Sequence, residues 1–409
     1  MSPDPVLSPR DVPASTPWAL RGELCTGLPG EPTVQDGVVV VEGERIAWCG
    51  PADDAPAPLR DAARPVPLIL PGLVDIHCHG GAGATFSADV PGSLRAARHH
   101  AAHGTTSVLA SLVSAPSDVL LEQIRALRSL VHRGELAGLH LEGPFIAESM
   151  CGAQNPRAII PGDPQLLEQW LQEGEGTVRS MTVGPETPRF PELVALCREY
   201  GVVPSIGHTA ATAAQTHDAL AADLTGGTWT ATHLFNRMPA LGHRTPGPVP
   251  VLLENAREDP DSMVLELIAD GVHLDPEIVR MVFSLVGSEA VALITDAMAA
   301  AGMAGGHYTL GALQVRVSDG VARLDPGHPG STDGAIAGGT SRLIECVRNC
   351  VDWGIPLPSA VTAASWTPAR ALGIDGVGYL GAGVRADLVV AGQDLSVGTV
   401  IKNGAPVTE

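Results

Sequence analysis

The chain has 409 residues, of which 44% are hydrophobic and 17% charged, and its formal net charge at pH 7 is −20. This length suits one large core, or a barrel with a smaller second domain. The negative charge argues against nucleic acid or an anionic membrane surface as the main partner. A phosphorylated metabolite stays compatible with it, because a single nearby Arg can outweigh the overall field.

The start of the chain and the cysteines indicate where the protein works. Residues 1–17 are rich in Pro, Ser and Asp and lack the basic and apolar regions of a signal peptide, so we expect a flexible leader. The seven cysteines include no Cys-x-x-Cys pair, which argues against both a disulfide framework and a zinc ribbon. No apolar run approaches the roughly 20 residues of a spanning helix. We therefore expect a soluble cytoplasmic protein.

Short β-like runs stand near both ends of the chain. Residues 37–42 and 45–50 form one pair, and residues 386–391 and 398–402 form another. Such runs on either side of a long middle segment predict one small β-sandwich domain, built from residues 18–66 and 374–409.

The middle segment, residues 67–373, alternates between strand-like and helix-like stretches. Its apolar runs cover residues 68–76, 105–110, 137–141, 178–183, 202–206, 228–232, 264–268 and 291–295. Helix-compatible stretches, including 120–131, 191–200, 212–222 and 276–286, lie between most of these runs. Eight strand–helix units predict an α/β fold of the (β/α)8 type, a TIM-like barrel whose active site lies at the carboxyl ends of the strands.

The first of these strands ends in a run that contains Asp75, His77 and His79. Alternate side chains of a strand share a face, so these three are expected on one side and Val74, Ile76 and Cys78 on the other. Two imidazoles two residues apart can hold one metal ion. The spacing alone proves little, so the other strand ends must decide.

Polar side chains stand at the ends of five further strands. They are His140 and Glu142, His208, His233, Asp270 with His273, and Asp296. A single His in an apolar stretch is more often a hydrogen-bonded core residue than a ligand. Six such strand ends on one rim of a barrel favour a metal site.

A bound divalent metal would explain these residue types. It lowers the pKa of a bound water to about 7, which gives hydroxide at neutral pH. A nearby carboxylate can orient that water, take its proton and pass it to the leaving group. Asp296 is the candidate for this role; the alternative is that it caps a helix at a βα turn.

Five motifs in order resemble the N-acetylglucosamine-6-phosphate deacetylases of the amidohydrolase superfamily. They are HLEGPF (140–145), GHT (207–209), THLFN (232–236), DGVH (270–273) and TDA (295–297). HLEGPF together with THLFN is highly specific, whereas GHT and TDA alone are weak. The resemblance covers nearly the whole chain and includes the split β domain.

The resemblance implies a metal site. Glu142, His208 and His233 would bind one divalent ion, with Zn²⁺ expected first and Fe²⁺, Mn²⁺ or Co²⁺ as alternatives. His77 and His79 imply a second ion with Glu142 as the bridge, although relatives without that pair work with a single ion.

The resemblance also implies the other site residues. Asp296 falls on the catalytic carboxylate, and His273 on the His that contacts the sugar and the amide. Arg244 would pair with the 6-phosphate from the neighbouring subunit, which implies a homodimer; alternatively it is a solvated loop charge. The remaining substrate contacts would come from Ala153, Gln154, Asn236, Arg237, Ile336, Ala337 and Gly338.

Two positions depart from the family pattern. Gln154 stands where the family usually has His, and Arg237 stands where it usually has Ala. Gln can still bond a sugar hydroxyl or a phosphate, but it cannot carry charge. These departures put the preferred sugar in doubt more than the type of reaction. Cys151 beside them is either open to oxidation or, as we favour, inert.

The expected reaction is hydrolysis of the acetamide of N-acetylglucosamine 6-phosphate by metal-bound hydroxide, giving glucosamine 6-phosphate and acetate. A deacetylase for the galacto epimer is the nearest alternative. Related hydrolases that need a carboxylated Lys are excluded, because Lys402 is the only lysine of the chain. A non-catalytic sugar-phosphate sensor is a further alternative, which the intact set of ligands and the acid–base carboxylate disfavours.

Overall fold

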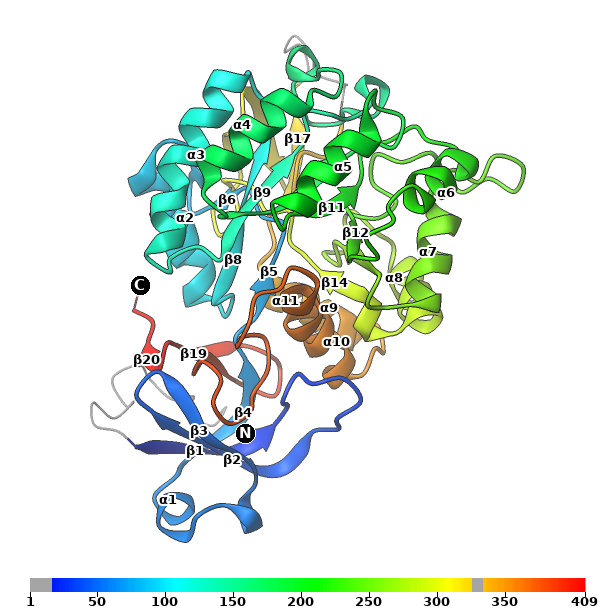
Figure 1. Cartoon of the computed structure of the whole chain (residues 1–409). Coiled ribbons are helices and arrows are strands. Elements are labelled where there is room, and N and C mark those ends of the chain that lie inside the picture. Colours follow the sequence, from blue (N-terminus) through cyan, green and yellow to red (C-terminus); the bar gives the residue numbers. More distant parts are fainter. Residues whose placement is uncertain (1–16, 326–333, 409) are drawn as a thin grey trace.

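The computed structural model describes residues 17–325 and 334–408, so the expected leader, apart from its last residue, lies outside the described residues. Two parts are visible in Figure 1. The larger part is an eight-stranded parallel sheet surrounded by helices, and the smaller part is a seven-stranded mixed sheet in which segments from both chain ends lie together. The α/β fold expected from the sequence, a barrel with a small β part from both ends, is confirmed.

The barrel strands follow one another around the sheet in chain order, and neighbouring strands pair in parallel. They are β5 (Val74–Asp75), β8 (Ser107–Val113), β9 (Gly138–Glu142), β10 (Val178–Val183), β11 (Val203–Ile206), β12 (Trp229–Ala231), β13 (Met263–Leu267) and β14 (Val291–Leu293). Parallel strands put all their carboxyl ends at one rim, which is where the polar residues of the motifs lie.

Ten helices of the described chain accompany the barrel. They are α2 (Val90–Ala102), α3 (Ser117–His132), α4 (Pro164–Gly174), α5 (Phe190–Glu199), α6 (Ala213–Ala221), α7 (Val249–Glu258), α8 (Pro276–Val286), α9 (Leu343–Asp352), α10 (Leu357–Ala364) and α11 (Trp366–Ala371). Local sequence fixes several starts. Thr212 and Gln215 form a capping box before α6, and Asp163 caps α4 with Pro164 in its first turn. All four helical stretches expected from the sequence are helices.

The first and last barrel strands meet through side-chain and loop contacts at the rim. Thr295 Oγ1 donates to Asp75 Oδ2 at 2.5 Å, and both side chains are buried. Just beyond, the amide of Asp296 donates to His77 O at 2.9 Å, and the amide of His79 donates to Ala297 O at 2.7 Å. We call this set of contacts the seam. The seam joins the first and last strands of the barrel directly beside the polar residues of the rim.

The smaller sheet has the strand order β20-β19-β18-β4-β1-β2-β3. Its strands are β1 (Trp18–Leu24), β2 (Val34–Glu42), β3 (Arg45–Pro51), β4 (Arg64–Pro71), β18 (Leu388–Ala391), β19 (Val397–Lys402) and β20 (Ala405–Pro406). The four β-like runs expected from the sequence lie in β2, β3, β18 and β19. The domain limits themselves remain a prediction.

The expectation of one continuous first barrel strand over residues 68–76 is wrong. The run divides into β4, which belongs to the smaller sheet, and β5, which belongs to the barrel. The break falls at Gly72, where a Cβ would lie 2.2 Å from Thr106 Oγ1. The chain can pass this close to its neighbour only without a side chain, so it leaves one sheet and enters the other here.

A three-stranded antiparallel sheet between β14 and α9 was not expected from the sequence. Its strands are β15 (Gly306–Leu310), β16 (Leu313–Ser318) and β17 (Val321–Leu324). Burial in β16 alternates strictly, which is the period of a half-buried strand. The smaller remaining elements are β6 (Gly80–Gly81), β7 (Ala84–Thr85), α1 (Ala57–Asp61), η2 (Ala52–Asp54), η3 (Glu148–Met150), η4 (Pro156–Ala158) and η5 (Ser288–Ala290).

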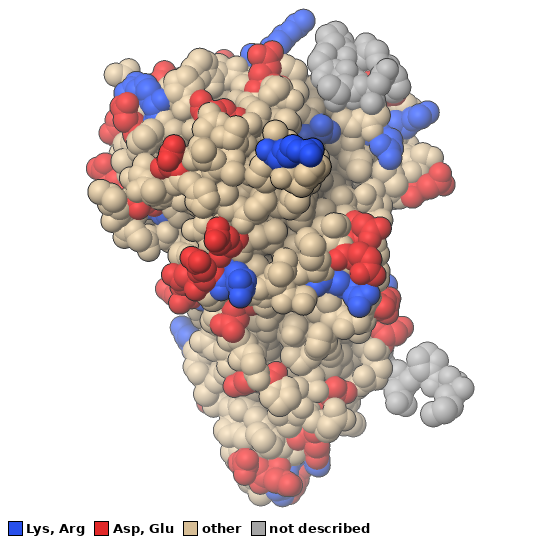
Figure 2. Space-filling view, turned by 90° about the vertical axis from the view of Figure 1, so that its right-hand side faces the viewer, with Lys and Arg blue, Asp and Glu red and all other residues tan. Residues whose placement is uncertain are grey.

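The surface agrees with the negative net charge. On the face drawn in Figure 2, basic side chains stand singly or in small groups among acidic ones, within a largely uncharged surface. A continuous basic surface of the kind that binds nucleic acid is not seen on that face. Among the described helices, none combines the length and the apolar character that crossing a membrane requires.

The seam makes a first prediction about stability. Thr295→Val keeps the shape of the side chain but removes the hydroxyl that donates to the buried Asp75 carboxylate. We expect the free energy of unfolding to fall by about 1–3 kcal/mol. Chemical denaturation followed by circular dichroism measures this. The control Thr309→Val, at an exposed position, should change the value by less than about 0.5 kcal/mol. Equal effects of the two variants would contradict the role of the seam.

Candidate metal centre and catalytic pocket

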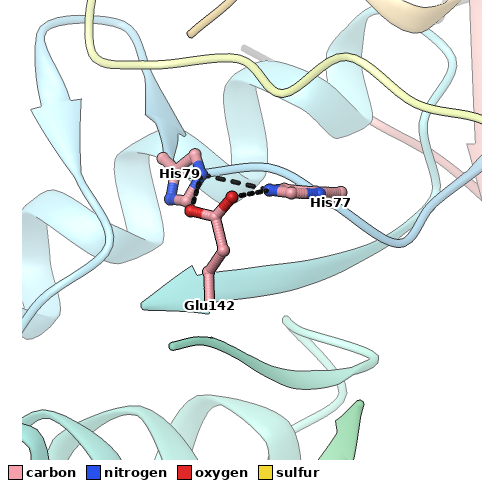
Figure 3. Close-up of side chains that lie close together, drawn as sticks. All are labelled: His77, His79 and Glu142. Carbon is pink, nitrogen blue, oxygen red and sulfur yellow. Dashed lines mark hydrogen bonds and ion pairs between the residues drawn. The ribbon is translucent and has the colours of Figure 1, made fainter. Parts of the chain in front are cut away.

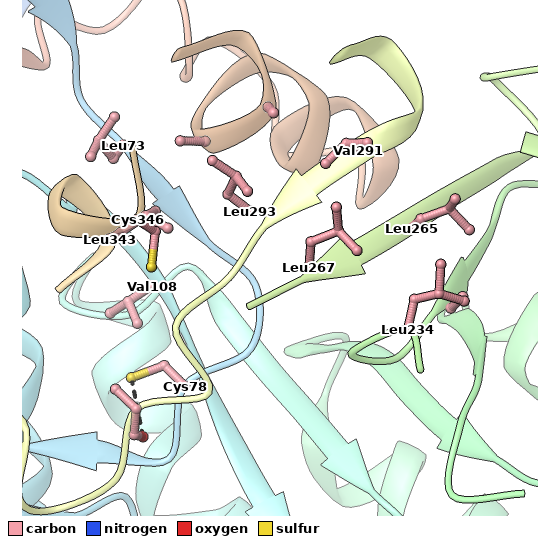
Figure 4. Packing of buried hydrophobic residues seen from close by; sticks show 14 of the residues in the cluster. Leu73, Cys78, Val108, Leu234, Leu265, Leu267, Val291, Leu293, Leu343 and Cys346 are labelled. Carbon is pink, nitrogen blue, oxygen red and sulfur yellow. Dashed lines mark hydrogen bonds between the residues drawn. The ribbon is translucent and has the colours of Figure 1, made fainter. Parts of the chain in front are cut away.

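The segment that follows β5 separates polar from apolar side chains as the strand period predicts. Asp75, His77 and His79 face the rim, and all three are buried. Cys78, between the two histidines in the sequence, belongs to the buried hydrophobic cluster that also contains Val108 and Leu73, and Figure 4 labels all three. The apolar neighbours of this segment therefore anchor it, and its two imidazoles are held in place at the rim.

One group of possible ligands consists of His77, His79 and Glu142, whose side chains converge in Figure 3. The two Nε2 atoms lie 3.2 Å apart. His77 Nε2 is 3.4 Å from Glu142 Oε1, and His79 Nε2 is 3.4 Å from Glu142 Oε2. The two oxygens of one carboxylate thus face one imidazole each.

A second group shares the same carboxylate. His208 Nε2 and His233 Nε2 lie 3.0 and 3.1 Å from Glu142 Oε1, and 3.1 Å from each other. Both histidines have positive φ, 46° and 29°, at the turns where β11 and β12 end. These left-handed turns aim both rings at Glu142. The chain therefore brings together all five residues that were expected from the sequence to bind metal.

The donor atoms fit a divalent cation. The Nδ1 of His77 lies 3.0 Å from Glu266 Oε2, while those of His79 and His208 lie 3.1 and 2.9 Å from the main-chain carbonyls of Ser111 and Met150. A carbonyl only accepts, so Nδ1 carries the hydrogen and Nε2 keeps its lone pair. Lone pairs that face one another at 3.2 Å need a cation between them. Imidazole nitrogens with a carboxylate suit zinc and neighbouring transition metals.

Charge balance at the site leads to the same interpretation. Burial lowers the pKa of His77 and His79, but the surrounding carboxylates outweigh it: Glu142 and Glu266 raise the pKa of His77 well above its usual value, and Asp296 and Glu142 raise that of His79 to about 9. These imidazoles therefore hold protons when no other cation is near. A metal ion has to displace those protons, so its affinity falls as the pH falls.

Asp296 lies on the wall of the same pocket. Its Oδ1 is 3.1 Å from His79 Nε2 and 3.5 Å from His77 Nε2. Its φ is +48°, and its amide is held by the seam. Irregular chain and then β15 follow this residue, so the alternative of a helix cap is wrong. The Asp296 carboxylate is therefore held beside His77 and His79, and it also faces the cavity.

His273 is held by its neighbour in the DGVH motif. Its Nδ1 lies 2.8 Å from Asp270 Oδ2, and Asp270 also accepts the amides of Val272 and His273. Burial lowers the pKa of His273, but the bond to Asp270 and the field of Asp296 raise it above its ordinary value. Asp270 thus orients the ring so that its Nε2 is the nitrogen left for a ligand.

One cavity of about 300 Å³ is lined by His79, Glu142, His208, His233, His273 and Asp296. Of the residues expected to bind substrate or act in catalysis, the cavity wall includes Ala153, Gln154, Asn236, Arg237, His273, Asp296, Ile336 and Gly338. Ala337 is fully buried beside it, in the core under β15–β17. Arg244 does not line the cavity of its own chain but lies exposed on the loop before α7. Leu310, at the end of β15, is a wall residue that was not expected from the sequence.

The amide of Gln154 is already engaged inside the protein. Its Nε2 donates to Glu142 Oε2 at 2.6 Å, and its Oε1 accepts the amide of Ser114 at 2.7 Å. The side chain is 2% exposed. Gln154 therefore contacts the shared carboxylate while it lines the cavity, and its expected contact with a sugar hydroxyl or phosphate stays a prediction.

Two further buried polar residues, Glu266 and His140, lie near the site, and the sequence did not show which of them supports the possible ligands. Glu266 is buried in β13; its Oε2 faces His77 Nδ1 and also accepts the amide of His233 at 3.1 Å. His140, a candidate from its strand end, instead lies between the hydroxyls of Ser111 and Thr182 in the barrel interior. A single Glu within the apolar run MVLEL was the available signal for Glu266.

Comparison with known proteins agrees with this geometry. The family model described as "Amidohydrolase family" matches residues 68–407. The chain belongs to the amidohydrolase family. It is 33% identical over 355 residues to the N-acetylglucosamine-6-phosphate deacetylase of Bacillus subtilis (strain 168), covering 82% of this chain and 84% of that protein. It is 34% identical to the N-acetylgalactosamine-6-phosphate deacetylase of Escherichia coli O157:H7, with 84% and 88% covered.

Solved structures give the same result. A variant of N-acetyl-D-glucosamine-6-phosphate deacetylase from Mycobacterium smegmatis, in complex with N-acetyl-D-glucosamine-6-phosphate, superposes with a TM-score of 0.88 at 38% identity, covering 97% of this chain and all of that one. The corresponding enzyme of Thermotoga maritima gives 0.81 at 29% identity, with 95% and 99% covered. The resemblance inferred from the HLEGPF and THLFN motifs is confirmed.

Glu266 generates a second prediction. Glu266→Gln keeps the size of the side chain but replaces the charged acceptor of His77 Nδ1. We expect the affinity for zinc to fall by about 10- to 100-fold, the usual effect of losing a residue that orients a ligand. Competition with a chelator measures the affinity, and the visible spectrum of the cobalt-substituted protein reports the geometry. Glu254→Gln, at an exposed position on α7, is the matched control. Unchanged affinity and spectrum in Glu266→Gln would refute the role.

Proposed function

We propose that the chain is a metal-dependent deacetylase that hydrolyses N-acetylglucosamine 6-phosphate to glucosamine 6-phosphate and acetate. The observation that carries this proposal is the single cavity that joins the two His–Glu groups, Asp296 and His273. Its support is the set of relatives that carry this name, at 33% to 39% identity over most of the chain.

The five residues Glu142, His208, His233, His77 and His79 would hold one or two divalent ions, with Glu142 between them. An ion held there supplies Lewis acidity, which lowers the pKa of water and polarises a carbonyl. Zinc is the first candidate, because four imidazoles and one carboxylate suit it; Fe²⁺, Mn²⁺ and Co²⁺ are accepted by the same donors.

Asp296 would act as general base and then as general acid. Burial raises the pKa of its carboxyl, but the hydrogen bond from His79 and the charge of His77 outweigh burial and lower it to about 2. As a carboxylate, Asp296 takes a proton from the attacking water as the C–O bond to the acetyl carbon forms. It returns that proton to the amide nitrogen, the C–N bond breaks, and the amine and acetate leave.

His273 would contact the sugar and the acetamide as the tetrahedral state forms, because Asp270 fixes its ring. Ala153, Asn236, Ile336 and Gly338 would shape the sugar pocket. Arg244, exposed in its own chain, would reach the phosphate of a neighbouring subunit. This assignment makes the working protein a homodimer, and we place it in the cytoplasm as the site of amino-sugar metabolism.

A second substrate has specific support. The relative from Escherichia coli O157:H7 is a deacetylase of N-acetylgalactosamine 6-phosphate and is 34% identical, as similar as the glucosamine enzymes. The two sugars differ in one hydroxyl configuration, so the same metal centre and the same acid–base carboxylate serve both. The reaction proposed here is common to the two substrates.

The decisive experiment measures acetate release from both phosphorylated epimers, with metal-depleted and zinc-reconstituted protein and with Asp296→Asn. We expect zinc-dependent turnover that drops by about 10²- to 10⁴-fold in the variant, the usual contribution of a general acid–base group. Asp296→Asn should still bind zinc. Binding of the sugar phosphate with no acetate release in the wild-type protein would refute the enzyme and favour a sensor.

A further inference from the structure

Arg237 is a cation in the wall of the catalytic cavity, and no carboxylate of the described residues pairs with it. Across residues 17–325 and 334–408, no hydrogen bond or ion pair engages its guanidinium. The two carboxylates of the cavity wall, Glu142 and Asp296, face the imidazoles of His77 and His79 instead. Within that part of the chain, the N–H groups of the Arg237 guanidinium therefore have no partner and can serve a ligand.

The backbone conformation at Arg237 and the absence of a side chain at Gly152 determine where the arginine side chain lies. Arg237 has a φ of +53°, and Gly152 opposite has a φ of +61°. A Cβ on Gly152 would lie 2.4 Å from Arg237 Nε, so the arginine packs directly on the glycine. A left-handed non-glycine residue is uncommon, and this one turns its side chain onto the only residue type that leaves it room.

The charge around the cavity makes this cation important. Among the described residues of the wall, Arg237 is the only Lys or Arg. A phosphate monoester entering the cavity meets the carboxylates of Glu142 and Asp296 within a chain of net charge −20. Imidazoles already face those two carboxylates, so a dianion held away from them is stabilised by a separate nearby cation. Arg244 is on an exposed loop of the same chain and does not contribute to this wall.

We propose that Arg237 pairs with the phosphate of the substrate within a single subunit and so selects phosphorylated over unphosphorylated amino sugars. The proposal rests on the deacetylase function above and refines its substrate class. A planar guanidinium can donate two parallel N–H bonds to two phosphate oxygens, which combines charge with direction. Any arginine from a partner subunit then adds to a phosphate site that already exists in one chain.

The test compares Arg237→Ala and Arg237→Lys with wild-type protein on N-acetylglucosamine 6-phosphate and on the unphosphorylated sugar. We expect Arg237→Ala to lower kcat/KM for the phosphorylated sugar by about 10- to 100-fold, the effect of one charged hydrogen-bonded pair, and to leave the unphosphorylated sugar nearly unchanged. Arg237→Lys should recover part of the loss, because it restores the charge but not the two-pronged geometry. Arg257→Ala, exposed on α7, is the matched control.

A second readout separates this proposal from the deacetylase function. Calorimetry with inorganic phosphate on the zinc-loaded protein should show binding that Arg237→Ala weakens to a similar degree and Arg257→Ala does not. If the wild-type protein released no acetate, this measurement would still support or overturn the phosphate contact. Equal losses on both sugars, or a loss confined to Arg244→Ala, would overturn it while leaving the deacetylase function intact.

Discussion

The structure at the rim depends on one carboxylate placed among four imidazoles. Glu142 ends β9, is 3% exposed, and lies within 3.0–3.4 Å of the Nε2 atoms of His77, His79, His208 and His233. A buried carboxylate is costly unless it is paired and hydrogen-bonded. Its surroundings meet that requirement, since the imidazoles come from three other strands and an amide donor comes from Gln154.

Other buried groups hydrogen-bond to those histidines and fix the orientation of their rings. Glu266 contacts the ring of His77 and the main-chain amide of His233. It therefore links the two groups of possible ligands that share Glu142. Main-chain carbonyls of Ser111 and Met150 fix two further rings. The centre is therefore positioned by the barrel strands together with the loop that holds Met150, while other loops and β15–β17 contribute walls of the cavity.

Much of this arrangement could be predicted from the sequence because its signals are local. Apolar runs separated by amphipathic helices identify a barrel, and parallel strands bring their polar ends to one rim, which suffices to place His208, His233 and Asp296 around a common site. The split of residues 68–76 at Gly72 was not predictable from hydrophobicity, because both halves are equally apolar and only the close approach of Thr106 explains it. The partner of Gln154 depends on the fold. The lone Glu266 in its apolar run signals a buried charge, but the sequence does not show which groups that charge contacts. The alternating strands β15–β17 did carry a readable signal, which the count of eight barrel strands obscured.

Because of the seam, the arrangement of the site depends on the first and last barrel strands being joined. The carboxylate of Asp296 follows the last barrel strand, and the imidazoles of His77 and His79 follow the first. They lie side by side because the seam joins these two strands. If the last strand were not joined to the first, the carboxylate of Asp296 would not lie beside the imidazoles of His77 and His79. With the acid–base role proposed for Asp296, turnover would then report whether the barrel has closed, which the helix content measured by circular dichroism would not.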